Sequence, residues 1–156
     1  DISPASRYNM TIEQINNIFL SLLERMKANN RLPGRVTISD IQRDLISNED
    51  FTITDWLESN GVALDYDIVD VNDMWHEAVN HQKMKSIAWL EDRKIYPTHI
   101  KIDEGVLEEL YKNNDLAFID RIKSFAQSLG IQLEYFPSDL LMLAINRQDI
   151  PTLEWL

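Results

Sequence analysis

The sequence predicts an all-α fold, a helical repeat solenoid of about four helix pairs that follow an N-terminal capping helix. The first observation is that a tryptophan-leucine pair recurs at intervals of 33 and then 66 residues, at Trp56-Leu57, Trp89-Leu90 and Trp155-Leu156. The second is that aligning the segments on these pairs leaves two further columns apolar. A period of this length is typical of helical repeat arrays, in which each short unit buries its apolar face against its neighbours.

The N-terminal segment, residues 1–36, does not follow the period. Thr11 and Gln14 have the spacing of a helix capping box, and an apolar stripe follows on one helical face from Ile12 to Met26. Asn29-Asn30 and Pro33-Gly34 then end the helix. We expect a helix over about residues 12–27 that caps the array or contacts a preceding domain. The alternative is that this segment contains a fifth, degenerate unit.

The remaining chain, residues 37–156, divides into units near 37–69, 70–102, 103–136 and 137–156, the last of them truncated. The two apolar columns lie six residues apart and recur at intervals of 33, 32 and 34; they are formed by Leu45, Ala78, Leu110 and Ala144, and by Phe51, Met84, Leu116 and Ile150. The stretches between the columns are rich in Asn and Asp, which favour turns and helix ends. Each unit is therefore predicted to be two short antiparallel helices.

Residues next to the helices refine this prediction. Pro151 stands where the second helix of the last unit would begin, a position that tolerates proline. Asp40, Asp73 and Asp139 precede the predicted first helices, where a carboxylate can accept backbone N–H groups. The second helix of the third unit is expected to be longer by about a turn, because Gly130 follows it later than Gly61 follows the first.

The units resemble the ankyrin repeat. His76 occupies the histidine of the Thr-Pro-Leu-His motif, Ala78 and Ala144 the first alanine after it, and Gly61-Val62 the closing Gly-Ala. The departures are that no unit begins with Thr-Pro and that four other residues replace the glycine of the helix-helix turn, namely Glu49, Gln82, Asn114 and Gln148. The resemblance implies a structural hydrogen bond for His76. Degenerate arrays of this kind are similar to those of effectors of intracellular bacteria and of large viruses, which implies an intracellular, cytoplasmic location, in the host cell for a secreted effector.

Composition sets further limits on function. The net charge is −11, and because residues 1–35 contribute +2, the remaining residues carry −13. Such an acidic surface is repelled by phosphate backbones and anionic lipids, so nucleic acid and membranes are not expected ligands, whereas a basic surface on a protein is. Alternatively, the acidity only keeps the array in solution. The chain contains no cysteine, no apolar run of membrane-spanning length and no signal peptide, and its final unit suggests a fragment of a larger protein.

The sequence contains no recognisable catalytic or metal-binding motif, and no cofactor is expected. His76 and His81 lie five residues apart and do not share a helical face, and the aspartates between Asp65 and Asp73 do not have the spacing of a calcium loop. The four glycines form no phosphate-binding loop. We therefore do not expect this chain by itself to be an enzyme.

The predicted function is that of a protein-protein interaction module. In the ankyrin family, the partner lies against the concave face and contacts the two variable residues after the alanine pair, and the resemblance assigns this role to Ser47, Asn48, Asn80, His81, Lys112, Asn113, Asn146 and Arg147. Tyr135 and Phe136, in a predicted loop, are candidate aromatic anchors, or pack beneath the longer third unit. The alternatives are a regulatory or substrate-recruiting segment of a multidomain enzyme, or a structural spacer that packs on its own neighbouring domains.

Overall fold

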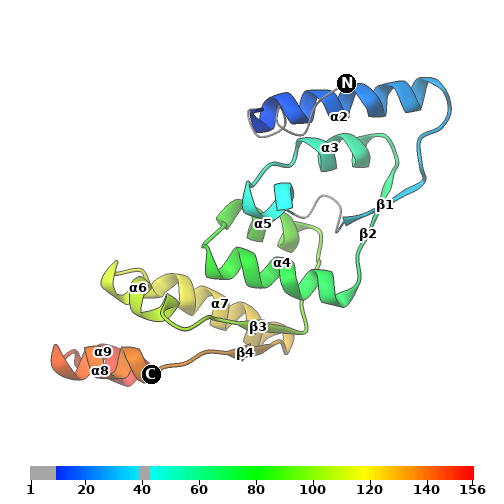
Figure 1. The fold of residues 1–156 in the computed structure, drawn as a ribbon. Helices are drawn as coiled ribbons and strands as arrows, with labels where there is room; N and C mark the ends of the chain where they lie inside the picture. The colour runs from blue at the N-terminus through cyan, green and yellow to red at the C-terminus, as the bar shows by residue number, and fades with distance from the viewer. Residues whose placement is uncertain (1–9, 39–42) are drawn as a thin grey trace. The chain divides into compact units, whose positions relative to one another are not determined.

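The computed structural model describes residues 10–38 and 43–156, and these residues form mostly helices (Figure 1). The chain divides into two compact units, Asp1–Tyr66 and Asp67–Leu156. No helix among the described residues is both long and apolar enough to cross a membrane. The predicted predominance of helix is confirmed.

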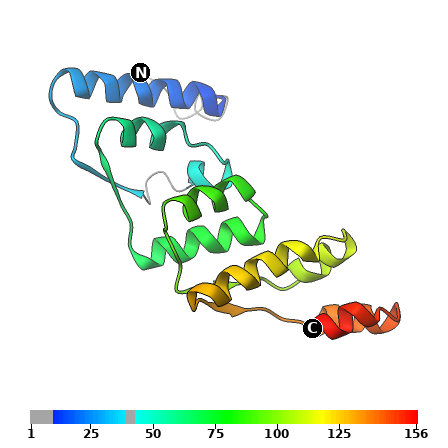
Figure 2. The same cartoon turned by 180° about the vertical axis from the view of Figure 1, so that it is seen from behind.

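The first unit contains the predicted N-terminal helix, α2 (Ile12–Ala28). Thr11 and Gln14 form the predicted capping box: the Gln14 backbone N–H donates to Thr11 Oγ1 at 3.1 Å, and the Thr11 N–H donates to Gln14 Oε1 at 2.9 Å. A strand β1 (Arg35–Thr37), a π-helical turn η2 (Arg43–Ser47), a helix α3 (Thr52–Ser59) and a strand β2 (Ala63–Asp65) follow. Helix α2 lies beside α3 in both views (Figures 1 and 2).

The second unit contains three helix pairs. The first helix of each pair is α4 (Ile68–Asn80), α6 (Val106–Lys112) or α8 (Ser138–Asn146), and the second is α5 (Met84–Asp92), α7 (Leu116–Leu129) or α9 (Ile150–Trp155). Strands β3 (His99–Lys101) and β4 (Gln132–Glu134) lie between the pairs. Helix α7 has 14 residues against nine in α5, as its later glycine predicts.

Helix α4 begins earlier than predicted. Asp67, rather than Asp73, is its N-cap residue, and Asp67 Oδ1 accepts a hydrogen bond of 2.9 Å from the Asp70 N–H. Asp73 lies inside the helix, so the expectation that it precedes the first helix is wrong. Gly105 does precede α6 as predicted, Asp139 falls within the bounds of α8, and Asp40 lies outside the described residues.

The two apolar columns have the predicted structural roles. Leu45, Ala78, Leu110 and Ala144 are all at most 3% exposed. In three pairs, this residue's carbonyl accepts the bond that ends the first helix: Lys83 N donates to Ala78 at 2.8 Å, Asp115 N to Leu110 at 2.8 Å, and Asp149 N to Ala144 at 2.9 Å. The second column marks the start of each second helix, because α5, α7 and α9 begin at its members and Phe51 is the N-cap of α3.

The turn between the two helices of each pair contains a left-handed residue. These residues are Glu49, Gln82, Asn114 and Gln148, with φ values of 51°, 49°, 56° and 52°. They are the four positions at which the ankyrin repeat has its turn glycine. A left-handed residue just past the helix end allows the following N–H groups to bond back to the last turn, which satisfies carbonyls that the helix leaves unpaired.

Two parallel strand pairs were not predicted. Strand β1 pairs with β2 in the first unit, and β3 pairs with β4 in the second, where the two strands lie side by side in both views (Figures 1 and 2). The register pairs His99 with Gln132, an offset of 33 residues that equals the sequence period. Equivalent segments of successive repeats run in the same direction, so pairing between them is parallel.

The largest buried side chain of the second unit, Trp75, joins several elements. Its Nε1–H donates to the Ile95 carbonyl at 2.8 Å, and its ring stacks on Phe125 of α7, with the centroids 4.8 Å apart. A buried indole needs such a partner for its N–H. Trp75 thus ties α4 to the loop after α5 and to the next helix pair.

Candidate functional site

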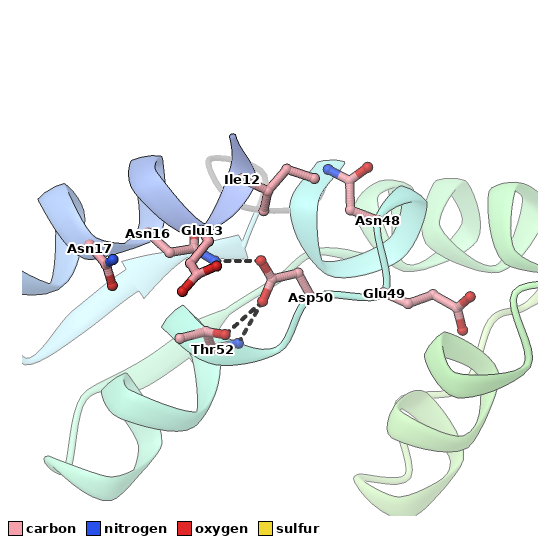
Figure 3. A pocket seen from close by; sticks show the side chains of 8 residues that line it. All are labelled: Ile12, Glu13, Asn16, Asn17, Asn48, Glu49, Asp50 and Thr52. Carbon is pink, nitrogen blue, oxygen red and sulfur yellow. Dashed lines mark hydrogen bonds between the residues drawn. The ribbon is translucent and has the colours of Figure 1, made fainter. Parts of the chain in front are cut away.

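A recess in the first unit, with a volume of about 550 Å³, is the candidate site (Figure 3). The N-terminal half of α2 forms one wall, and the turn from η2 to α3 forms the other. Eight residues line it: Ile12, Glu13, Asn16, Asn17, Asn48, Glu49, Asp50 and Thr52. These side chains include three carboxylates and three amides but no basic group, so the lining is anionic and rich in hydrogen-bonding groups.

Asp50 organises the wall of this recess. Asn16, which is buried on α2, donates a hydrogen bond from Nδ2 to Asp50 Oδ2. Thr52 donates to Asp50 Oδ1 from its backbone N–H at 3.1 Å and from its hydroxyl at 2.7 Å. Figure 3 shows Asn16 and Thr52 reaching Asp50 from α2 and α3, respectively. The carboxylate therefore joins the two helices that enclose the recess.

Asp50 remains negatively charged in this environment. Burial by itself raises its pKa, but the hydrogen bonds from Thr52 and Asn16 favour the charged form and together bring the pKa below its ordinary value of 3.8. Glu13 and Glu49 add two further carboxylates, and in Figure 3 Glu49 extends away from Asp50. The recess thus offers a fixed negative charge with additional acidic groups on its rim.

The position of Asp50 recurs at the end of the second unit. Asp149 precedes α9 as Asp50 precedes α3, and it accepts hydrogen bonds from the Thr152 N–H at 3.2 Å, the Thr152 hydroxyl at 2.7 Å and the Tyr111 hydroxyl at 2.7 Å. The bonds from Tyr111 and Thr152 lower the pKa of Asp149, and the same contact with Asp149 raises the pKa of Tyr111. An acceptor before the second helix therefore also binds a donor from the preceding helix pair.

The predicted partner residues lie at the end of each first helix or just past it. Within this set Asn48, His81, Lys112, Asn113, Asn146 and Arg147 are exposed, and Ser47 is half-buried. Asn48 borders the recess. The structure also brings the last two pairs close together, since the Arg147 guanidinium lies 5.2 Å from the ring centroid of Tyr111, the neighbour of Lys112.

Asn80 does not fit the predicted role of an exposed partner residue. It is only 8% exposed. Its Nδ2 donates to the carbonyls of His76 and Lys101, both at 2.8 Å, and its Oδ1 accepts the Asp103 N–H at 2.7 Å. Asn80 is therefore a structural residue that joins α4 to the segment after β3, a role that sequence position alone did not reveal.

The two histidines of α4 and its C-terminus have different contacts. His76 Nε2 lies 3.0 and 2.9 Å from the two carboxylate oxygens of Asp103, which gives it the structural contact that the ankyrin resemblance implies. His81 is exposed, and its Nε2 lies 3.6 Å from Glu77 Oε2. Among the described residues, no group of three His, Asp or Glu side chains could hold a metal ion.

The aromatic candidates differ in their surroundings. Tyr135 is half-buried, and its ring centroid lies 5.0 Å from Lys123 Nζ on α7, in agreement with the alternative that it packs beneath the third unit. Phe136 is exposed, with Lys101 Nζ 5.8 Å from its ring centroid. Only Phe136 is thus placed as an open aromatic anchor.

The recess itself was missed by the sequence analysis. Its lining comes from two segments more than thirty residues apart, and only the pairing of Asn16 with Asp50 brings them together. The available signal was a polar residue, Asn16, within the apolar stripe of α2. Searches against protein-family models, curated proteins and solved structures give no match to this chain.

Proposed function

We propose that this chain is a protein-binding module built from ankyrin-like helix pairs. What supports the ankyrin-like architecture is the recurrence of left-handed turns at intervals of 33, 32 and 34 residues, together with the 33-residue register of β3 and β4. Arrays of this kind present polar residues at the ends of successive first helices as one continuous binding surface. The exposed members of the predicted partner set occupy these places.

The partner contributes a basic side chain, which enters the recess beside Asn48. The observation that carries this proposal is the lining of three carboxylates, one of them held charged by hydrogen bonds from Asn16 and Thr52. A guanidinium or ammonium group would compensate these charges and could donate to the amide oxygens around them. The net charge of −11 attracts such a partner at long range.

A pair of short peptides tests the recess. An acetylated, amidated pentapeptide with arginine at its centre and glycine elsewhere is titrated into the isotopically labelled chain, and backbone amide shifts are followed by NMR. We expect shifts at Glu13, Asn48 and Thr52, and none with the same peptide carrying glutamine. Equal shifts with both peptides, or shifts spread over the whole acidic surface, would contradict the proposal.

Matched variants separate the recess from general acidity. Glu13→Gln combined with Glu49→Gln should reduce the arginine-dependent shifts, whereas Glu104→Gln, an exposed acidic residue outside the recess, should not. For a protein partner captured with the chain, Lys112→Ala combined with Asn113→Ala should weaken binding without unfolding, because both residues are exposed. Undiminished binding by both double variants would instead favour a spacer.

A further inference from the structure

Both ends of the described chain expose apolar helix faces at positions that are buried elsewhere in the same chain. At the start, Phe19, Leu22 and Met26 of α2 are exposed. At the end, Leu141, Met142 and Ile145 of α8 and Ile150 of α9 are exposed. An apolar face on a helix normally packs against another element.

The face of α2 is equivalent to a buried face of α7. Both helices end with the same bond, from Arg31 N to the Met26 carbonyl and from Ile131 N to the Ala126 carbonyl, each 2.8 Å long. Counting back from these acceptors matches Phe19, Leu22 and Met26 with Ile119, Ile122 and Ala126. Phe19 is 51% exposed and Ile119 is 0% exposed, and the other two matched pairs differ in the same direction.

The face of α8 is equivalent to a buried face of α6. Ala144 and Leu110 accept the bonds that end these helices, so Leu141 matches Leu107 and Ile145 matches Tyr111. Ile145 is 48% exposed, whereas Tyr111 is 7% exposed. The following helix pair covers the α6 face, since α8 packs on α6 and Asp149 accepts the Tyr111 hydroxyl. The α8 face is therefore the continuation of an interface already present in the chain.

We propose that the exposed face of α8 and α9 docks on the exposed face of α2 in a second copy of this chain. The two faces are apolar, and they are the two sides that neighbouring helices cover within the chain. Their surroundings have opposite charge: residues 10–35 contain four Lys or Arg and two Asp or Glu, and residues 138–156 contain one Arg and three Asp or Glu, a balance of +2 against −2. This surface is separate from the recess and does not depend on the proposed function.

The contact joins two different faces, so it is heterologous. Such a contact leaves one free face at each end of every assembly, and association continues unless the geometry closes a ring. We expect sedimentation velocity to show species larger than the monomer whose proportion rises over about a hundredfold range of concentration. A chain that is monomeric throughout this range would overturn the proposal.

Charge substitutions identify the faces. Phe19→Glu and Ile145→Glu should each weaken self-association by about tenfold or more, because an unpaired carboxylate is costly in an apolar contact. Both side chains are exposed in the monomer, so the variants should fold, which circular dichroism and thermal unfolding verify. Val69→Glu, at an exposed position on α4, is the matched control and should leave association unchanged.

Mixing the two variants decides between heterologous and symmetric contacts. Each variant retains one intact face, α8 with α9 in Phe19→Glu and α2 in Ile145→Glu. We expect the mixture to form a one-to-one dimer that grows no further. Self-association of either variant at the wild-type level, or a mixture that remains monomeric while the wild type associates, would contradict the proposed pairing.

Discussion

Six residues other than glycine adopt positive φ in the part of the chain that the structure describes: Asn30, Glu49, Gln82, Lys94, Asn114 and Gln148. A left-handed backbone costs a residue with a Cβ about 1–2 kcal/mol, which glycine avoids. Each of these residues lies at the end of a helix, where the conformation is required for the closing hydrogen bonds. The chain therefore retains the turn geometry without the residue that best suits it.

This strain predicts a stabilising substitution. Gln148→Gly should raise the free energy of unfolding by roughly 0.5–1 kcal/mol, after allowance for the greater freedom of glycine in the unfolded chain. The reverse change, Gly61→Ala at φ 75°, should lower it by about 1 kcal/mol, although its Cβ would meet no atom within 4 Å. Urea unfolding of both variants measures the two effects, and a loss of stability in Gln148→Gly would show that the side chain matters more than the backbone.

Asp50 predicts a dependence of stability on pH. Its folded-state pKa lies below the ordinary value of 3.8, so its contribution to stability is present above that pH and is lost as the pH falls through the folded-state pKa. Thr52→Val removes one donor to the carboxylate and should raise the pKa of Asp50, which moves the loss of stability to higher pH. NMR titration of the carboxyl carbon measures the pKa, and Thr37→Val, on the exposed strand β1, should leave it unchanged.

The same scale accounts for the tryptophan column. At Arg121, where the third unit has no tryptophan, the sequence suggested a contact with the Trp89 or Trp155 ring. The structure instead places the Arg93 guanidinium 4.2 Å from the Trp89 ring centroid and Lys123 Nζ 3.7 Å from that of Trp155. Arg121 Nη2 lies 3.4 Å from Glu91 Oε1. Cations nearer to the rings in space take the contact, which spacing along the chain does not show.

At the scale of elements, α2 resembles the second helices of the pairs. It ends at the left-handed Asn30 as α3 ends before Gly61 and α7 before Gly130. Its Glu24 Oε1 accepts the Trp56 Nε1–H at 2.7 Å, as Asp120 of α7 accepts that of Trp155. These shared features favour the interpretation of residues 1–36 as part of a fifth, degenerate unit over that of a simple cap.

Close approach of helices at the first apolar column predicts the effect of adding volume there. Ala78 is fully buried, so Ala78→Leu should overpack the second unit and lower its stability by about 1–3 kcal/mol. Ala117→Leu, an exposed position on α7, is the matched control and should be nearly neutral. Thermal unfolding compares the two, and an unchanged midpoint for Ala78→Leu would count against the close packing of these helices.

The bonds of Asn80 predict a second effect on packing between elements. Asn80→Ala should cost about 1–3 kcal/mol, because the Asp103 N–H and the Lys101 carbonyl would lose their partner. The exposed Asn113 stands at the next position along the chain from the equivalent residue, and Asn113→Ala should have little effect. Equal stability of the two variants, measured by urea unfolding, would show that water replaces the lost amide without cost.

At the scale of the whole molecule, charge governs how partners approach. With a net charge of −11, association with a basic partner should slow as ionic strength rises, because salt screens attraction beyond about 10 Å at 0.1 M. Surface plasmon resonance with the captured partner measures this dependence. The double variant Glu13→Gln with Glu49→Gln should show a smaller salt effect, and an association rate independent of salt would indicate an apolar contact surface instead.

The sequence by itself determined the helix pairs, their period and the start of each second helix, because these depend on local turn chemistry and on apolar columns such as Leu45 and Ala78. It also determined α2, through the capping box at Thr11. The tertiary structure alone decided that Asn80 is buried, that Asp67 caps α4, that the linking segments form parallel strands, and that Asn16 meets Asp50 to form the recess. Each of these depends on which polar group finds a partner from a distant segment, and since the residue types involved favour exposed and buried positions alike, only the folded arrangement selects between them.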